Sequence, residues 1–305
     1  MELGEAVAQE LERIAPGQVR RDEPMSRHTS FGLGGNADLF VEATSPRAFK
    51  DAAALLSDEG VPIKVLGRGT NLLVRSGGVE GAVMSSEKAF TNLAVEGTRV
   101  TAGGGLGLAR LLSFCAERGL AGLDGLAGIP GSVGGAVVTN AGSFGVSMGE
   151  RLSDVVLFEP GKASVRVPSG DLVVRYRKTE IPSGAVVEEV GLTLEHGDPA
   201  GIAARQREVL ESKWRTQPVG MRSAGCVFRN PPGHSAGRLI DEAGLKGTRV
   251  GGAVVSDMHA NYVLNDRGAT PEDVEELLEL VRERVFTHSG VRLELEIEVL
   301  GRRAN

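Results

Sequence analysis

The chain has 305 residues, of which 41% are hydrophobic and 24% charged, so it is long enough for two or three domains with cores of their own. Its net charge of -6, without a long basic run, argues against a nucleic-acid partner, and no apolar run approaches the ~20 residues that a membrane span needs. Two cysteines in a chain of this length favour the reducing cytoplasm over a disulfide scaffold.

Short helices and strands alternate before residue 120. The hydrophobic pattern and the turn residues predict an acidic amphipathic helix over 1–16, a strand over 37–42, a helix from Ser45-Pro46 to Gly60, strands over 61–66 and 99–103, and a helix over 106–118. The acidic character of the first helix distinguishes it from a signal peptide. Cys115 falls in the apolar pattern of the last helix, so we expect a small buried residue there.

The rest of the chain changes character near residue 198. Strands and Pro-Gly turns dominate residues 155–195, and a long helix capped by Asp198 then runs through Trp214. Another helix opens at Thr270-Pro271, and the alternation of 291–300 predicts a terminal strand. These patterns indicate the α+β class, with the best domain boundary near 198.

The chain has 43 glycines, and two glycine-rich runs are the strongest candidates for function. They are residues 66–74 and residues 127–136, the latter followed by 140–142. Backbone N–H groups in such loops form anion-binding concavities, and glycine removes the side chains that would block a phosphate. Neither is a P-loop, and residues 32–37 lead into a strand pattern rather than a helix, which argues against a Rossmann fingerprint. A single glycine is explained by a turn, but the two clusters together favour a phosphate-bearing cofactor.

Seven runs, taken in order, resemble a known enzyme family. They are residues 29–35 (TSFGLGG), 67–74 (GRGTNLLV), 128–135 (GIPGSVGG), Tyr176-Arg177, 223–231 (SAGCVFRNP), 259–261 (HAN) and 293–296 (LELE). The ordered set is similar to UDP-N-acetylenolpyruvoylglucosamine reductase, the flavoenzyme that makes UDP-N-acetylmuramate for bacterial peptidoglycan. The chain length resembles the shorter form of that family, which lacks a substrate-covering tyrosine loop.

The resemblance implies a two-lobed FAD-binding domain of the vanillyl-alcohol-oxidase type plus a C-terminal α+β substrate-binding domain. We expect the first lobe over residues 1–86, the second over 87–198 and the substrate domain over 199–295. The terminal residues 296–305 can return to the first lobe.

The resemblance also implies FAD held between the lobes without a covalent link, and His28 is interpreted as a loop residue. The pyrophosphate is expected on residues 68–72 and 131–135. The full set of expected cofactor contacts is Leu66, Gly67, Arg68, Gly69, Thr70, Asn71, Leu72, Gly128, Ile129, Pro130, Gly131, Ser132, Val133, Gly134, Gly135, Asn140 and Gly142.

The implied reaction reduces the enolpyruvyl ether of UDP-N-acetylglucosamine enolpyruvate, with NADPH as the reductant of FAD. Hydride from flavin N5 reaches the enolpyruvyl C3 and leaves negative charge on C2 and the carboxylate. The site therefore needs a cation at the carboxylate, a second polar group that holds it, and an acid that faces C2.

Arg177 and Glu296 fill the first two needs by resemblance. An arginine fork grips a carboxylate, but the residues alone equally allow a strand-surface arginine beside Arg175 and Lys178, and the Tyr-Arg motif decides for the former. Glu296 aligns with the catalytic glutamate of the family. Glu294 and Glu298 share its face of the predicted strand and are explained as a solvated acidic face.

Cys226 is the implied proton donor, where the commonest family pattern has serine. A lone cysteine is ordinarily a small buried residue, and the flanking SAGCVFRNP run reverses that interpretation here. A thiol of pKa ~8.5 stays mostly protonated at neutral pH and is a stronger acid than an alcohol, so the role survives the substitution. Greater sensitivity to oxidation is expected with it.

Five further residues are expected to contact or position substrate. Asn230 matches the substrate-binding asparagine of the family, whereas Arg215 and Arg222 either meet the UDP pyrophosphate or are solvated charges. His259 and Asn261 are interpreted as positioning groups rather than metal ligands, because no second His or Cys lies at ligand spacing.

Two other functions fit the same scaffold. One is another FAD-dependent oxidoreductase of the same fold, such as an oxidase, which rapid reoxidation of the reduced protein by air without substrate would favour. The other is a non-catalytic flavin or nucleotide-sugar binding module, which failure to oxidise NADPH in the presence of substrate would favour. The run over 223–230 and the predicted strand of Glu296 argue against the oxidase, and the joint presence of Cys226, Arg177 and Glu296 argues against the binding module.

Overall fold

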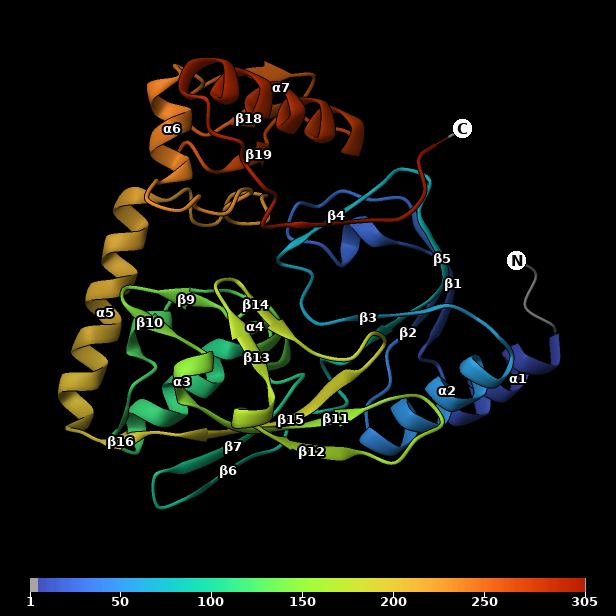
Figure 1. The fold of residues 1–305 in the computed structure, drawn as a ribbon. Helices are drawn as coiled ribbons and strands as arrows, with labels where there is room; N and C mark the ends of the chain where they lie inside the picture. The colour runs from blue at the N-terminus through green and yellow to red at the C-terminus, as the bar shows by residue number, and fades with distance from the viewer. Residues whose placement is uncertain (1–4, 305) are drawn as a thin grey trace. The chain divides into compact units, whose positions relative to one another are not determined.

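The computed structural model describes residues 5–304, which divide into two compact units (Figure 1). Unit 1 is formed by the described parts of Met1–Arg21, Leu39–Arg68 and Gly81–Ser212. Unit 2 is formed by those of Asp22–Asp38, Gly69–Glu80 and Lys213–Asn305. Both units therefore assemble segments that are far apart in the sequence.

Unit 1 contains most of the regular structure. Its helices are α1 (Glu5–Ile14), α2 (Pro46–Asp58), α3 (Leu108–Glu117), α4 (Val133–Val138) and most of α5 (Pro199–Thr216). Its strands are β3 (Ile63–Leu66), most of β5 (Val79–Ser85), β6 (Leu93–Glu96), β7 (Arg99–Gly103), β8 (Leu120–Ala121), β9 (Gly142–Ser143), β10 (Val146–Ser147), β11 (Leu152–Phe158), β12 (Val165–Pro168), β13 (Val173–Arg175), β14 (Lys178–Glu180), β15 (Val186–Thr193) and β16 (Glu195–His196). Strands β1 (Val19–Pro24) and β2 (Asn36–Val41) each begin in one unit and end in the other.

A five-stranded antiparallel sheet of order β12-β11-β15-β7-β6 organises the later part of unit 1. Helices α3 and α4 cover one of its faces (Figure 1) and share a core with it. The buried side chains of α3, among them Leu108, Leu111, Leu112 and Cys115, recur at helical spacing. This packing fixes where α4 begins, at Val133 within the second glycine run.

A second core of unit 1 lies around α1 and α2, which pack on β2, β3 and β5. Ser45 caps α2 by accepting the Ala48 amide at 3.2 Å, and Pro46 occupies the first helical position. Phe49, together with residues 52, 53 and 56, forms the buried stripe of that helix. The cap and the stripe together explain why the helix forms where the sequence predicts it.

Unit 2 contains β4 (Leu72–Val74), α6 (Ala236–Glu242), β17 (Arg249–Val250), β18 (Ala253–Val255), β19 (Val263–Asn265), α7 (Pro271–Ser289) and β20 (Glu298–Leu300). Helix α7 packs on the small antiparallel sheet β17-β18-β19 (Figure 1). The side chains of Thr270 and Asp273 form a capping box at its start, and Gly290 ends it in the left-handed conformation. Strand β20 pairs in parallel with β4, which brings the end of the chain to the first glycine run.

Most predicted elements are confirmed, including the strand at 99–103 and the helix after Asp198, whose carboxylate accepts the Gly201 amide at 2.9 Å. The predicted first helix is confirmed over Glu5–Ile14, and residues 1–4 lie outside the described residues. The continuous strand predicted over 291–300 is wrong: the described chain has an isolated bridge at Leu295 and a strand only at Glu298–Leu300. The lobe and domain boundaries drawn from the sequence stay a prediction.

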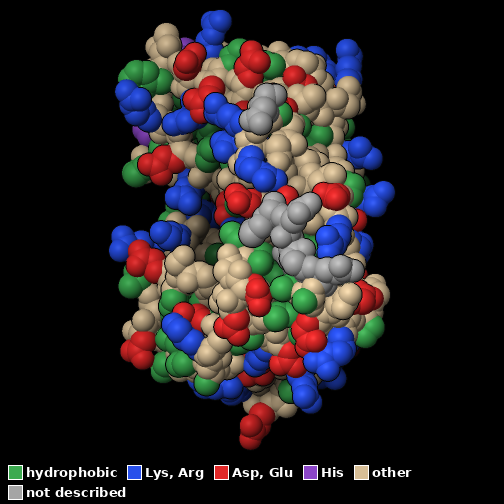
Figure 2. All heavy atoms as spheres, turned by 90° about the vertical axis from the view of Figure 1, so that its right-hand side faces the viewer, with side chains coloured by type: hydrophobic (Ala, Val, Ile, Leu, Met, Phe, Trp, Pro, Cys, Tyr) green, Lys and Arg blue, Asp and Glu red, His purple; other side chains and the backbone are tan. Residues whose placement is uncertain are grey.

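Basic and acidic side chains are mixed over the face drawn in Figure 2. Within the described residues, no helix is long and apolar enough to cross a membrane.

Candidate active site

The second glycine run forms the start of α4 in unit 1, and most of its amides are used internally. The amides of residues 133–135 donate, in order, to the Leu106 carbonyl at 2.8 Å, the Gly104 carbonyl at 2.8 Å and the Ser132 hydroxyl at 3.2 Å. Among the described hydrogen bonds, none is donated by the amides of Gly128, Gly131 and Ser132. Of the residues 131–135 on which the pyrophosphate was expected, the amides of Gly131 and Ser132 are therefore the ones left to meet an anion.

Two of the glycines in these runs are required by close packing. A Cβ at Gly134 would lie 2.9 Å from the Gly104 carbonyl oxygen and 3.3 Å from the Val187 Cβ. One at Gly67 would lie 2.4 Å from the Ser132 hydroxyl. The backbone at residue 67 therefore approaches the cap of α4 closely, and this contact joins the two glycine runs within unit 1.

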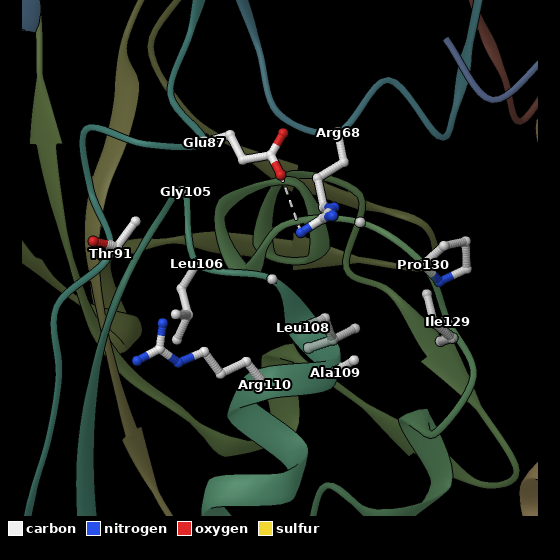
Figure 3. A pocket seen from close by; sticks show the side chains of 12 residues that line it. Arg68, Glu87, Thr91, Gly105, Leu106, Leu108, Ala109, Arg110, Ile129 and Pro130 are labelled. Carbon is white, nitrogen blue, oxygen red and sulfur yellow. Dashed lines mark ion pairs between the residues drawn. The ribbon is translucent and has the colours of Figure 1, made fainter. Parts of the chain in front are cut away.

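A pocket of about 510 Å³ opens beside the second glycine run (Figure 3). Its lining comes from the loop before α3, from α3 itself and from residues 129–131. Arg68 and Glu87 point toward one another at its edge, with 3.2 Å between the guanidinium and the carboxylate. Four residues expected to bind the cofactor, Arg68 and residues 129–131, thus line one pocket.

Arg177 lies in the two-residue turn between β13 and β14. The alternative interpretation of Arg177 as an arginine on the surface of a strand is therefore wrong. Its backbone is left-handed, with φ +57°, a conformation that is costly for a residue with a Cβ. Its guanidinium donates to the Gly142 carbonyl at 2.8 Å. Such strain at a non-glycine residue is typical of functional positions.

Asn140 holds the hairpin that carries Arg177. Its side-chain amide donates to the Arg175 carbonyl at 2.9 Å and accepts the Gly149 amide at 2.9 Å. The side chain of Asn140 therefore both donates and accepts a hydrogen bond, and the residue is buried with φ +39°. In this structure Asn140 and Gly142, both expected to contact the cofactor, contact the Arg177 hairpin.

Cys226 lies in unit 2 on an extended segment fixed from both sides. The amide of the next residue, Val227, donates to the Asn261 carbonyl at 2.9 Å, and its carbonyl accepts the Glu296 amide at 2.9 Å. The buried Asn261 side chain bonds both backbone groups of Phe228, at 3.0 and 2.8 Å. The structure thereby brings the segments of Cys226 and Glu296 together.

The side chain of Cys226 has a neighbour that the sequence did not reveal. Tyr262 forms an isolated antiparallel bridge with Cys226, which places the two side chains next to each other on one face of the paired segments. The Tyr262 hydroxyl donates to the Gln217 side-chain oxygen at 3.0 Å. Burial, and then the neighbouring Cys226 and Glu296, raise the pKa of the Tyr262 hydroxyl. In the sequence, the one indication of a role for Tyr262 is that its polar side chain directly follows the HAN run.

Glu296 is half-buried, whereas Glu294 and Glu298 are exposed. Asn71 of the first glycine run donates to the Glu296 carbonyl at 3.2 Å and so joins that run to the acidic segment within unit 2. Glu294 lies 3.9 Å from the Arg229 guanidinium. The difference in burial supports the separation of Glu296 from its two neighbours.

The remaining expected substrate residues all lie in unit 2. Asn230 is exposed, and its side-chain oxygen accepts the Ala236 amide at 2.9 Å at the start of α6. Arg215 and Arg222 are exposed. Burial lowers the pKa of the His259 imidazole, whose Nδ1 accepts the Asn261 amide at 3.2 Å.

Two family models match the chain. An FAD binding domain matches residues 37–158, and the C-terminal domain of UDP-N-acetylenolpyruvoylglucosamine reductase matches residues 217–300. An FAD-binding domain followed by this C-terminal domain defines a flavin-dependent reductase.

Relatives match the chain along nearly its whole length. UDP-N-acetylenolpyruvoylglucosamine reductase from Alkalilimnicola ehrlichii is 42% identical over 291 residues, which cover 95% of this chain and 97% of the relative. Reductase 2 of that name from Symbiobacterium thermophilum is 40% identical over 94% of this chain and 93% of the relative. The crystal structure of the Thermus caldophilus enzyme superposes with a TM-score of 0.82 at 38% identity, over 93% of this chain and 99% of that one. The chain belongs to the UDP-N-acetylenolpyruvoylglucosamine reductase family.

Proposed function

We propose that the protein catalyses the NADPH-dependent reduction of UDP-N-acetylglucosamine enolpyruvate to UDP-N-acetylmuramate, a step of peptidoglycan precursor synthesis in the cytoplasm. The observation that carries this proposal is the meeting of Cys226 and Glu296 on bonded segments of unit 2 in a member of this family. An acid and a carboxylate carried on neighbouring hydrogen-bonded segments suit protonation of a carbon next to a carboxylate.

The residues present fit a flavin dinucleotide. The amides of Gly131 and Ser132, next to the close contact of Gly67 with Ser132, form a backbone surface that a pyrophosphate can approach. Arg68 adds a cation at the edge of the neighbouring pocket. We propose that these groups would hold FAD without a covalent link, and the bound cofactor would supply hydride transfer from NADPH to the substrate.

Replacing Gly134 by alanine is expected to weaken flavin binding by about tenfold or more. The new Cβ would meet the Gly104 carbonyl, which is backbone and cannot turn away, so the start of α4 and the Gly131 amide must shift. The measurement is the flavin-to-protein absorbance ratio and a flavin titration of the stripped protein. Gly170→Ala is the control, because nothing lies within 4 Å of a Cβ there. Equal flavin content in both variants would contradict the assignment.

The roles of the catalytic side chains follow from their chemistry. Arg177 presents a guanidinium on a strained turn, so its fork can grip the substrate carboxylate and stabilise the charge that develops there. Glu296 provides a half-buried carboxylate that holds the reacting group in place. Cys226 gives its proton to C2.

We propose that the substrate side of the site uses Asn230, Arg215 and Arg222, with the arginines facing the diphosphate. His259 and Asn261 act by position: Asn261 fixes the backbone that follows Cys226, and His259 in turn accepts the Asn261 amide.

The test is an absorption spectrum of the purified protein followed by two additions. A flavin band is expected, it should bleach with NADPH under anaerobic conditions, and it should return when UDP-N-acetylglucosamine enolpyruvate is added. Recovery with air but not with that substrate would indicate an oxidase of the same fold instead. A protein that binds flavin but never oxidises NADPH would overturn the proposal.

A further inference from the structure

The backbone places Tyr262 directly opposite Cys226. Their bridge is made by the flanking Val227 amide and Asn261 carbonyl, so the pair is of the non-hydrogen-bonded type. In such pairs the two Cα atoms are only about 4.5 Å apart, and the side chains lie close together on one face. Backbone pairing therefore places the side chains of Tyr262 and Cys226 next to each other.

The hydrogen bond of the Tyr262 hydroxyl to Gln217 sets the direction that a hydrogen bond between Tyr262 and the neighbouring Cys226 would take. The hydroxyl donates to the Gln217 side-chain oxygen at 3.0 Å, which is an acceptor only. With its proton engaged there, the hydroxyl oxygen is left to accept the S–H of Cys226. The resting order is thus thiol to phenol to amide.

We propose that Tyr262 is a positioning residue for the proposed acid: it holds the Cys226 thiol in the resting enzyme and turns its hydroxyl onto the sulfur when the sulfur loses its proton. This inference rests on the proposed function. In the proton transfer, the S–H bond breaks, a C–H bond forms at C2, and the electron pair stays on sulfur. Tyr262 keeps its own proton throughout, and solvent later restores that of Cys226.

The charged and titratable groups around Tyr262 and Cys226 explain why a neutral hydroxyl donor would help the thiolate of Cys226. Glu296, on the adjacent segment, places a carboxylate near the tyrosine and so opposes a second negative charge. His259 contacts the Tyr262 ring edge-on at 5.0 Å, and burial lowers its pKa, so it offers no cation at neutral pH. Because burial and its neighbours raise the pKa of the Tyr262 hydroxyl, it stays protonated and remains a donor.

The test is the rate of Cys226 alkylation by iodoacetamide as a function of pH, in the flavin-loaded protein and with the adduct located by mass spectrometry. Tyr262→Phe is expected to raise the midpoint by about one pH unit, because the thiolate loses a hydrogen bond. Gln217→Leu is expected to lower the midpoint, because the Tyr262 hydroxyl then has no hydrogen bond to Gln217 to break when it turns to the sulfur. Cys115 serves as the silent reference, since burial raises its pKa to about 12.

An unchanged midpoint in Tyr262→Phe, or a midpoint that does not fall in Gln217→Leu, would overturn the inference. The two variants shift the midpoint in opposite directions, so general loosening of the fold cannot imitate the result. Tyr262→Phe should also lower kcat by about tenfold with KM unchanged. Alkylation needs neither substrate nor turnover, so failure here is distinct from failure of the proposed function, which a protein that never oxidises NADPH in the presence of substrate would reveal.

Discussion

Cys226→Ala is expected to lower turnover by about 10²- to 10⁴-fold, the range in which a positioned general acid contributes. Loss of the thiol removes the proton source for C2, whereas the proposed flavin contacts in unit 1 are untouched. NADPH should therefore still bleach the flavin at the normal rate. Stopped-flow absorbance with NADPH alone, and then with substrate, separates the two halves of the reaction.

Cys226→Ser is the conservative partner of that variant and should keep substantial activity. A serine hydroxyl is a weaker acid than a thiol, but it occupies the same place opposite Tyr262 and can donate a proton from the same position. Cys115→Ala controls for thiol loss as such: Cys115 lies in the core of α3, so its loss should cost stability and leave turnover intact. Wild-type turnover by Cys226→Ala would remove Cys226 from the mechanism.

Local signals account for the parts of the fold that could be predicted. The helix at α2 begins where a serine cap precedes a proline, and α7 begins where Thr270 and Asp273 satisfy each other's backbone amides. Both partners of each capping interaction lie within four consecutive residues, so a short stretch of sequence is enough to predict it. The buried stripe of α3, with Cys115 in it, follows from helical spacing in the same way.

The terminal segment shows why strands are harder to predict. Residues 291–297 alternate as a strand would, yet a strand forms only where another offers its backbone. In the described chain, β4 pairs with Glu298–Leu300, and Phe228 supplies one bridge to Leu295. Alternation indicated which side chains would be buried, and the partners decided how much of the segment became a strand.

The candidate site was predictable in its residues more than in its contacts. The family motifs pointed to Cys226 and Glu296, but the Tyr262 hydroxyl reaches Gln217 across 45 positions, and no periodicity reports such a contact. Arg177 could not be placed in a turn from its neighbours, since Arg175-Tyr176-Arg177-Lys178 contains none of the usual turn residues. Its left-handed backbone is imposed by the hairpin pairing and by Asn140, not by local preference.

Arg177→Ala is expected to lower turnover by about 10²- to 10³-fold, comparable to the loss of one preorganised group that stabilises developing charge. The proposed role of the guanidinium is at the substrate carboxylate and not in the delivery of electrons from NADPH, so anaerobic flavin reduction should remain fast. Arg177→Lys should recover little of the lost turnover, because an ammonium cannot grip a carboxylate with two parallel bonds. Slow flavin reduction in the alanine variant would contradict this placement.

Comparison of Arg177→Ala with Arg177→Gly separates function from strain at the same position. Both variants lose the guanidinium and its bond to the Gly142 carbonyl, so both should be equally inactive. They differ in the Cβ at φ +57°, which glycine lacks, so the glycine variant should be more stable than the alanine variant by about 1 kcal/mol. Urea denaturation of the two proteins measures that difference. If the glycine variant were the less stable of the two, the turn would not be strained, and the retention of arginine there would need no functional explanation.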